Sequence, residues 1–264
     1  MNSTINGIKL SYQLDGPTGR PVLVLIHGFP FTRATWKGQV GALKKRFRVL
    51  TYDLRGMGQS GLGATPQPLE AYVDDLVALL DHLRIAKAGV AGLSMGGYIA
   101  LRAIQRAPER FWAAALCDTK AAPDSDEGRL GRAAGIKALR TKGVRPFSEG
   151  MLPKLLAKPK AAAGRGLLRV MLKNKVAGMT NALAAMQGRT DTTAGLKAFK
   201  APVLVINGSA DLVIPTKVAK EMASARKGIA WKNLAGAGHV SNLEAPTAFN
   251  AALLSFFTKA YDKA

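Results

Sequence analysis

The chain of 264 residues contains one cysteine, Cys117, so no disulfide can form within it. Because stable disulfides belong to oxidising compartments, this scarcity favours a reducing one. Residues 1–7 show neither the charged segment nor the apolar segment of a signal peptide, and no apolar run approaches the roughly 20 residues that span a bilayer. We therefore expect a cytoplasmic protein without a membrane partner, either a monomer or a homo-oligomer.

Acidic residues are scarce: 17 aspartates and glutamates face 38 lysines and arginines, which leaves a net charge of +21. Residues 119–200 carry +12 of this excess. Such a field attracts anionic small molecules or nucleic acid, although it is also compatible with an ordinary solvated surface. No aromatic residues interleave the basic ones and no nucleic-acid motif occurs, so we expect a small-molecule partner and no specific nucleic acid.

Apolar runs typical of strands alternate with helical patterns along most of the chain. This alternation predicts an α/β fold with a mostly parallel central sheet and helices on both faces. The expected strands cover residues 8–14, 21–26, 48–52, 88–91, 113–117, 203–206 and 230–234, and a closing helix covers 250–261.

The alternation stops between residues 119 and 200, where Arg, Lys, Ala and Leu dominate and no strand is expected. We interpret this region as an inserted helical cap. Residues 1–118 and 201–264 would then form a single α/β core.

Gly92, Ser94 and Gly96 form a Gly-x-Ser-x-Gly pattern between an apolar run and a run of helix formers. A strand that turns abruptly into a helix holds its corner residue in a strained conformation and exposes the side chain. The flanking glycines allow strand and helix to crowd together. Ser94 is therefore the candidate nucleophile.

Two further residues follow in the order required for a serine triad. Asp211 comes after an apolar run and a short turn, and His239 comes after a late strand and a glycine-rich loop. A serine hydroxyl is a weak nucleophile until an imidazole accepts its proton and a carboxylate orients that imidazole. Asp118, at the end of an earlier strand, is the competing candidate for the acid, and Asp211 is favoured.

The apolar run 21–26 leads directly into His27, Gly28 and Phe29. In serine hydrolases of this architecture, one oxyanion donor is the N–H after the nucleophile and the other comes from a loop after an early strand. These donors are expected to be the backbone N–H groups of Met95 and Phe29. His27 is a less favoured candidate base and is expected to hold this loop by hydrogen bonds.

Together these motifs resemble those of the α/β-hydrolase superfamily, within its serine esterase, 3-oxoadipate enol-lactonase and haloperoxidase-like branch. They extend over essentially the whole chain. The motifs are His27-Gly28-Phe29-Pro30, the loop from Asp53 to Ser60, Gly92-Leu93-Ser94-Met95-Gly96-Gly97, Gly208-Ser209-Ala210-Asp211 and Gly236-Ala237-Gly238-His239. The resemblance implies an α/β-hydrolase fold, a Ser-His-Asp triad and no cofactor.

We therefore expect a serine hydrolase that cleaves a carboxylic ester or lactone, possessing neither a metal nor an organic cofactor. The loop 53–60 has too few carboxylates to hold calcium. Met151, Leu152, Met179 and Val240 are expected to line the substrate pocket. Two alternatives stay open: cofactor-free perhydrolysis on the same residues, and a non-catalytic ligand-binding or nucleic-acid-associated basic protein on a hydrolase scaffold.

Overall fold

The computed structural model describes residues 1–159 and 161–262 of the chain. Across these residues the strands form one eight-stranded sheet in the order β1-β2-β4-β3-β5-β6-β7-β8. β1 and β2 pair antiparallel with their neighbours, whereas the pairs from β4 and β3 through β7 and β8 are parallel. The expected mostly parallel sheet is confirmed. The strands are β1 Asn2–Ile5, β2 Ile8–Asp15, β3 Val22–Ile26, β4 Arg48–Tyr52, β5 Ala88–Leu93, β6 Phe111–Cys117, β7 Val203–Gly208 and β8 Ala230–Leu234.

The strands β2 to β8 match the expected ranges to within two residues at either end. β1 was not expected. It forms a hairpin with β2 in which Ile5 pairs with Ile8 around Asn6 and Gly7, both at positive φ. An Asn-Gly pair is the usual sequence signal of such a tight turn, so this strand had a readable signature.

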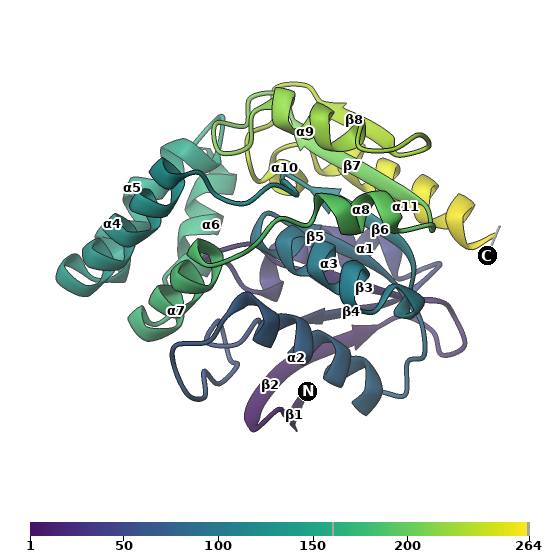
Figure 1. The fold of residues 1–264 in the computed structure, drawn as a ribbon, viewed down its shortest axis with the longest axis horizontal. Helices are drawn as coiled ribbons and strands as arrows, with labels where there is room; N and C mark the ends of the chain where they lie inside the picture. Colours follow the sequence, from purple (N-terminus) through teal and green to yellow (C-terminus); the bar gives the residue numbers. More distant parts are fainter. Residues whose placement is uncertain (160, 263–264) are drawn as a thin grey trace.

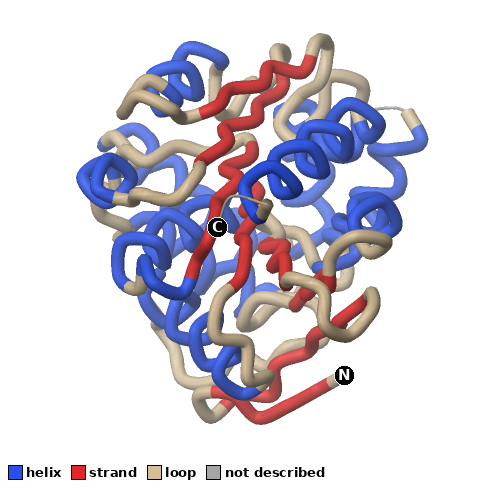
Figure 2. Tube along the Cα trace, turned by 90° about the vertical axis from the view of Figure 1, so that its right-hand side faces the viewer, coloured by secondary structure: helices blue, strands red, loops and turns tan. Residues whose placement is uncertain are grey.

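The side chains of β3 alternate between the two faces of the sheet. Val24 and Ile26 join one apolar core, and Leu23 and Leu25 join the other. Figure 2 shows helices on both sides of the strands, as expected. Residues of α2, α3, α8 and α9 belong to the first core, and residues of α1 and α11 belong to the second. Their ranges are α1 Lys37–Leu43, α2 Leu69–His82, α3 Met95–Arg106, α8 Thr193–Ala198, α9 Thr216–Ala223 and α11 Pro246–Tyr261.

Helices also fill the chain between β6 and β7. Figure 1 shows α4 to α7 standing beside the carboxyl-terminal side of the sheet, whereas α8 returns to lie along α3. None of the helices in residues 1–159 and 161–262 has the length and hydropathy needed to cross a membrane. The helices of this insertion are α4 Asp126–Lys142, α5 Val144–Leu155, α6 Ala162–Met171, α7 Val176–Gln187 and α8.

A close backbone contact joins α7 to the loop of residues 53–60. A Cβ atom built on Gly178, in the first turn of α7, would lie 1.8 Å from the carbonyl oxygen of Gly56. Gly56 itself has φ +73 and would place its own Cβ 2.8 Å from the Cα of Gly178. Glycine is needed on both sides because any side chain would force the two backbones apart.

This contact predicts that Gly178→Ala destabilises the fold. Overpacking typically costs about 1 to 3 kcal/mol, and here the new methyl meets rigid backbone, so we expect a loss of about 2 kcal/mol or more in the free energy of unfolding. Gly188→Ala, at the other end of α7, is the control, since its Cβ would lie 3.8 Å from the nearest atom. Urea denaturation of both variants tests this, and equal stability would contradict it.

Candidate active site

Ser94 occupies the single residue between β5 and α3. Its φ of 53° is unusual for a residue with a side chain. A Cβ on Gly92 would lie 2.2 Å from the carbonyl oxygen of Gly96, and a Cβ on Gly96 would lie 2.2 Å from that of Ile26. The two glycines therefore allow the strand to turn into the helix within one residue. The serine is placed at the carboxyl end of the central strand, where the loops after β3, β6, β7 and β8 meet.

A chain of hydrogen bonds runs from Asp211 through His239 to Ser94. The Nδ1 atom of His239 lies 2.8 Å from Oδ2 of Asp211, and its Nε2 atom lies 2.8 Å from Oγ of Ser94. With Nδ1–H donating to the carboxylate, Nε2 is left to accept the serine proton. The other carboxylate oxygen of Asp211 accepts from the N–H groups of Val213 and Ile214 at 2.7 and 2.9 Å, which fixes its orientation.

Asp118 lies close to this chain but does not bond the imidazole in the structure. Its Oδ1 accepts from the N–H of Gly208 at 2.8 Å, and its Oδ2 accepts from the hydroxyl of Ser241 at 2.5 Å. Burial, followed by the negative charge of Asp211, raises the pKa of Asp118 to about 7. The side chain thus ties the loop that leads to Asp211 to the helix that follows His239, Ser241–Glu244 (α10).

The loop after β3 packs against the serine. A Cβ on Gly28 would lie 3.1 Å from the Cβ of Ser94. Nδ1–H of His27 donates to the carbonyl of Gly28 at 2.8 Å, and Nε2 accepts from the N–H of Leu54 at 3.0 Å. Burial lowers the pKa of His27 in spite of the nearby Asp53, consistent with the neutral ring that these bonds require. His27 therefore links the loop to residues 53–60.

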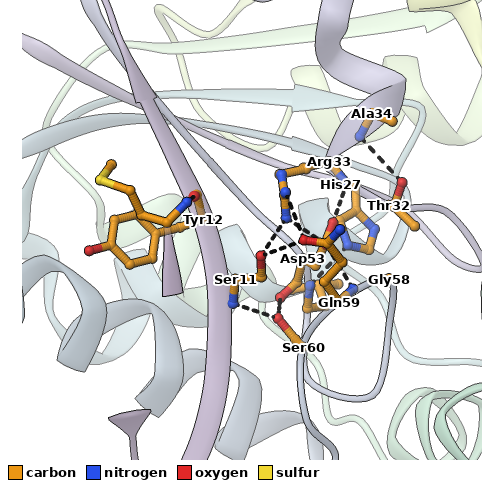
Figure 3. Close-up of polar contacts among 12 residues, drawn as sticks. Ser11, Tyr12, His27, Thr32, Arg33, Ala34, Asp53, Gly58, Gln59 and Ser60 are labelled. Atoms are coloured by element: carbon orange, nitrogen blue, oxygen red, sulfur yellow. Dashed lines mark hydrogen bonds and ion pairs between the residues drawn. The ribbon is translucent and has the colours of Figure 1, made fainter. Parts of the chain in front are cut away.

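The loop of residues 53–60 supports this segment and is called the supporting loop below. The Asp53 carboxylate accepts from the backbone N–H of Arg33 at 2.8 Å, from its guanidinium at 2.6 Å and from the N–H of Gln59 at 3.0 Å. Figure 3 shows Arg33, His27 and Asp53 packed together beside Ser60 and Ser11. The carboxylate is therefore a structural anchor for the segment after β3.

Phe29 and Met95 lie next to the serine on two different elements. Phe29 borders the same cavity as Ser94 and His239. Met95 is the first residue of α3, where backbone N–H groups have no partner within the helix. The role of these two N–H groups as oxyanion donors stays a prediction.

Comparison with known proteins gives this arrangement a context. Residues 23–252 match the alpha/beta hydrolase family. The chain belongs to this family. It is 30% identical over 249 residues to 3-oxoadipate enol-lactonase 1 of Acinetobacter baylyi, covering 92% of this chain and 91% of that one. The expected family and the α/β-hydrolase fold are confirmed.

Solved structures agree with this assignment. A thermophilic esterase from Thermogutta terrifontis superposes with a TM-score of 0.92 at 32% identity, over 98% of both chains. The enol-lactonase from Burkholderia xenovorans superposes with a TM-score of 0.91 at 31% identity, over 98% of this chain and all of the other. The hydrolase therefore shares the fold of this esterase and this enol-lactonase over nearly its whole length.

A cavity of about 410 Å³ adjoins Ser94 and His239 in this hydrolase. Its apolar lining comes mostly from the insertion and includes Phe147, Met151 and Leu183. A larger hollow of about 580 Å³ lies between β8 and α11, and none of the triad candidates lines it. Since Ser94 and His239 line the smaller cavity, we take it as the candidate substrate site.

Of the residues expected to line the pocket, Met151 borders this cavity. The other three pack elsewhere among the described residues. Met179 is fully buried in the core that contains α2 and α3, whereas Val240 and Leu152 join the core that contains α11. The positions of Met179 and Leu152 depend on how each helix of the insertion is rotated, which apolar spacing alone does not specify.

Charged residues of the insertion border the cavity, and sequence reasoning did not single them out. The carboxylate of Asp124 contacts Lys120 at 3.3 Å, Arg132 at 3.1 Å and Arg189 at 3.1 Å. The guanidinium of Arg189 also lies 3.9 Å above the ring of Tyr98. Burial opposes the ionisation of Asp124, but the surrounding cations outweigh it and hold its pKa below the usual range.

Lys154 adds a further positive charge to the cavity lining. The single carboxylate of Asp124 cannot neutralise Lys120, Arg132 and Lys154 together, so this wall of the cavity carries an excess of positive charge. The structure offers little to a metal ion by comparison. Residues 1–159 and 161–262 contain no group of three or more His, Cys, Asp or Glu side chains placed to hold one.

The raised pKa of Asp118 predicts a pH-dependent contribution to stability. The folded protein holds this proton up to about pH 7, whereas the unfolded chain releases it near the ordinary value of 3.8. Stability should therefore fall as the pH rises from about 4 to 7 and level off above. Asp118→Asn cannot ionise, so it should not lose this stability. Its thermal midpoint minus that of the parent should therefore be larger at pH 8 than at pH 5, by about 3 °C or more.

Thermal unfolding followed by circular dichroism at several pH values measures this difference. Asp126→Asn, which changes an exposed carboxylate in the first turn of α4, is the control and should follow the parent curve. Parallel curves for Asp118→Asn and the parent would show that the buried carboxyl does not titrate as stated.

Proposed function

We propose that this hydrolase cleaves carboxylic esters or lactones through an acyl-enzyme formed on Ser94. The observation that carries the proposal is the unbroken hydrogen-bonded chain from Asp211 through His239 to a serine on a strained turn. Oγ of Ser94 attacks the carbonyl carbon while its proton passes to Nε2 of His239. Asp211 keeps the imidazole in the required tautomer and stabilises the imidazolium that forms.

The N–H groups of Phe29 and Met95 donate to the oxyanion of the tetrahedral intermediate. The intermediate then collapses, the bond between the carbonyl carbon and the alkoxy oxygen breaks, and His239 returns the proton to that oxygen. A water molecule next gives a proton to His239 as its oxygen attacks the acyl carbon. The bond between that carbon and Oγ of Ser94 then breaks and His239 returns the proton to Oγ, which releases the carboxylic acid and restores Ser94. In a lactone the alkoxy oxygen stays on the same molecule, so one hydroxy acid is the product.

For the substrate we favour a small ester or lactone that itself carries a carboxylate. The positive wall formed by Lys120, Arg132 and Lys154 faces the cavity that holds Ser94. A volume of about 410 Å³ suits a small molecule. The names of the similar proteins, an enol-lactonase and an esterase, agree with this substrate class. We assign the choice of substrate to residues 119–200, acting as a cap over the core.

The nucleophile can be tested directly. A fluorophosphonate probe should label Ser94 alone, and Ser94→Ala should lower kcat on p-nitrophenyl butyrate by a factor on the order of 10⁶ while the fold remains intact. Ser224→Ala, which changes an exposed serine after α9, should retain full activity. Mass spectrometry of the labelled peptide identifies the serine. Label on another residue, or an active Ser94→Ala variant, would rule out this mechanism.

The anionic substrate can be tested by changing the charge of the cavity wall. We expect Arg132→Gln and Lys154→Gln each to lower kcat/KM about fivefold or more for mono-p-nitrophenyl succinate, with little effect on p-nitrophenyl butyrate. The reason is that only the first ester has a carboxylate to attract. Arg140→Gln and Lys137→Gln are the matched controls, because these exposed residues of α4 do not line the cavity.

Salt supplies an independent measurement of the same effect. Raising the ionic strength above about 0.1 M, where the Debye length is about 10 Å, should lower kcat/KM for the anionic ester and leave that for the neutral ester nearly unchanged. Equal responses of the two esters, to both salt and substitution, would show that the basic wall does not select the substrate.

A further inference from the structure

Asn174 is a buried polar residue of the insertion that joins two loops of the core. It lies between α6 and α7 and is 5% exposed. Its Nδ2 donates to the carbonyl of Pro30 at 2.7 Å, and its Oδ1 accepts from the N–H of Gly58 at 2.8 Å. Because one contact needs a donor and the other an acceptor, together they fix the orientation of the amide.

The loop that Asn174 holds is the one that carries Phe29. Pro30 follows Phe29 directly, and Gly28 on the other side of Phe29 is held by His27. The two supports hold the residues before and after Phe29, and both end on the supporting loop, residues 53–60. His27 bonds the N–H of Leu54, and Asn174 bonds the N–H of Gly58.

The supporting loop has little freedom to shift. Gly58 has φ +54, and a Cβ there would lie 2.5 Å from the carboxyl group of Asp53. Four residues after Asn174, the backbone of Gly178 lies directly against that of Gly56. The insertion is therefore fixed to the supporting loop close to Asn174. The position of the Asn174 side-chain amide thus follows from rigid backbone contacts.

We propose that Asn174 is a positioning residue for the oxyanion hole, holding the loop after β3 so that the N–H of Phe29 points at the developing oxyanion. The inference rests on the function proposed above. An oxyanion donor contributes to the rate only when it lies within a few tenths of an ångström of its place in the transition state. A tether one residue away controls that placement without touching the substrate.

Asn181 provides a matched control on the same part of the chain. It lies in α7, is also 5% exposed, and likewise joins the insertion to the core. Its Oδ1 accepts from the N–H of Gln67 at 2.8 Å, and its Nδ2 donates to the hydroxyl of Tyr72 at 3.1 Å. Neither partner belongs to the loop after β3, so Asn181→Ala reproduces the loss of a buried tether without disturbing Phe29.

The experiment compares Asn174→Ala with Asn181→Ala by thermal midpoint, by kcat and KM on p-nitrophenyl butyrate, and by the inhibition constant of an alkyl trifluoromethyl ketone. That ketone forms a hemiketal on the serine and places an oxyanion in the hole. We expect both variants to lose similar thermal stability. Asn174→Ala should lower kcat about tenfold to a hundredfold and leave KM within threefold of the parent value. The inhibition constant of the ketone should rise by a factor similar to the loss in kcat. Asn181→Ala should change kcat and inhibition less than twofold.

Equal kinetic losses in the two variants, or a rise in KM at constant kcat for Asn174→Ala, would overturn the positioning role. Should Asn174→Ala fail to fold, Asn174→Asp keeps the acceptor for Gly58 and removes the donor to Pro30, and the same selective loss is expected. Labelling of Ser94 in the parent separates the two ideas. An unlabelled, inactive parent contradicts the proposed function, whereas a labelled, active parent with an unaffected Asn174 variant contradicts only this inference.

Discussion

The close packing of Gly92 against Gly96 is the constraint on which the reactive side of this hydrolase depends. No atom larger than hydrogen fits at either position, so β5 can turn into α3 within one residue and hold Ser94 at φ 53°. Parallel strands bring their carboxyl ends to one edge of the sheet. The loops that carry Asp211 and His239 therefore reach the same point, and short hydrogen bonds close the arrangement.

Around this turn, rigidity comes from backbone contacts and buried hydrogen bonds. The loop of residues 53–60 supports the segment after β3 through Asp53 and Leu54 and receives α7 at Gly56. On the other side, Asp118 joins the loop before Asp211 to the start of α10. The loops around Ser94 are thus each held by buried contacts, which limits their freedom to reorganise.

The insertion contributes charge as well as shape. Most of the basic excess of residues 119–200 is on exposed helix surface, but Lys120, Arg132 and Lys154 border the cavity. Asp124 holds two of these cations in place and offsets only part of their charge. A positive wall with fixed geometry attracts an anionic group and also orients it, which a diffuse surface charge does not do.

Local signals in the sequence determined the approximate ranges of β2 to β8, the glycine-flanked turn at Ser94 and the chain order of Ser94, Asp211 and His239. These features depend on short-range periodicity and turn chemistry, and the known handedness of such folds brings them together. Only the tertiary structure decided which residues of the insertion face the cavity and that Asn174 reaches the loop of Phe29. The rotation of each inserted helix follows from distant contacts such as Gly56 against Gly178, which no local pattern encodes.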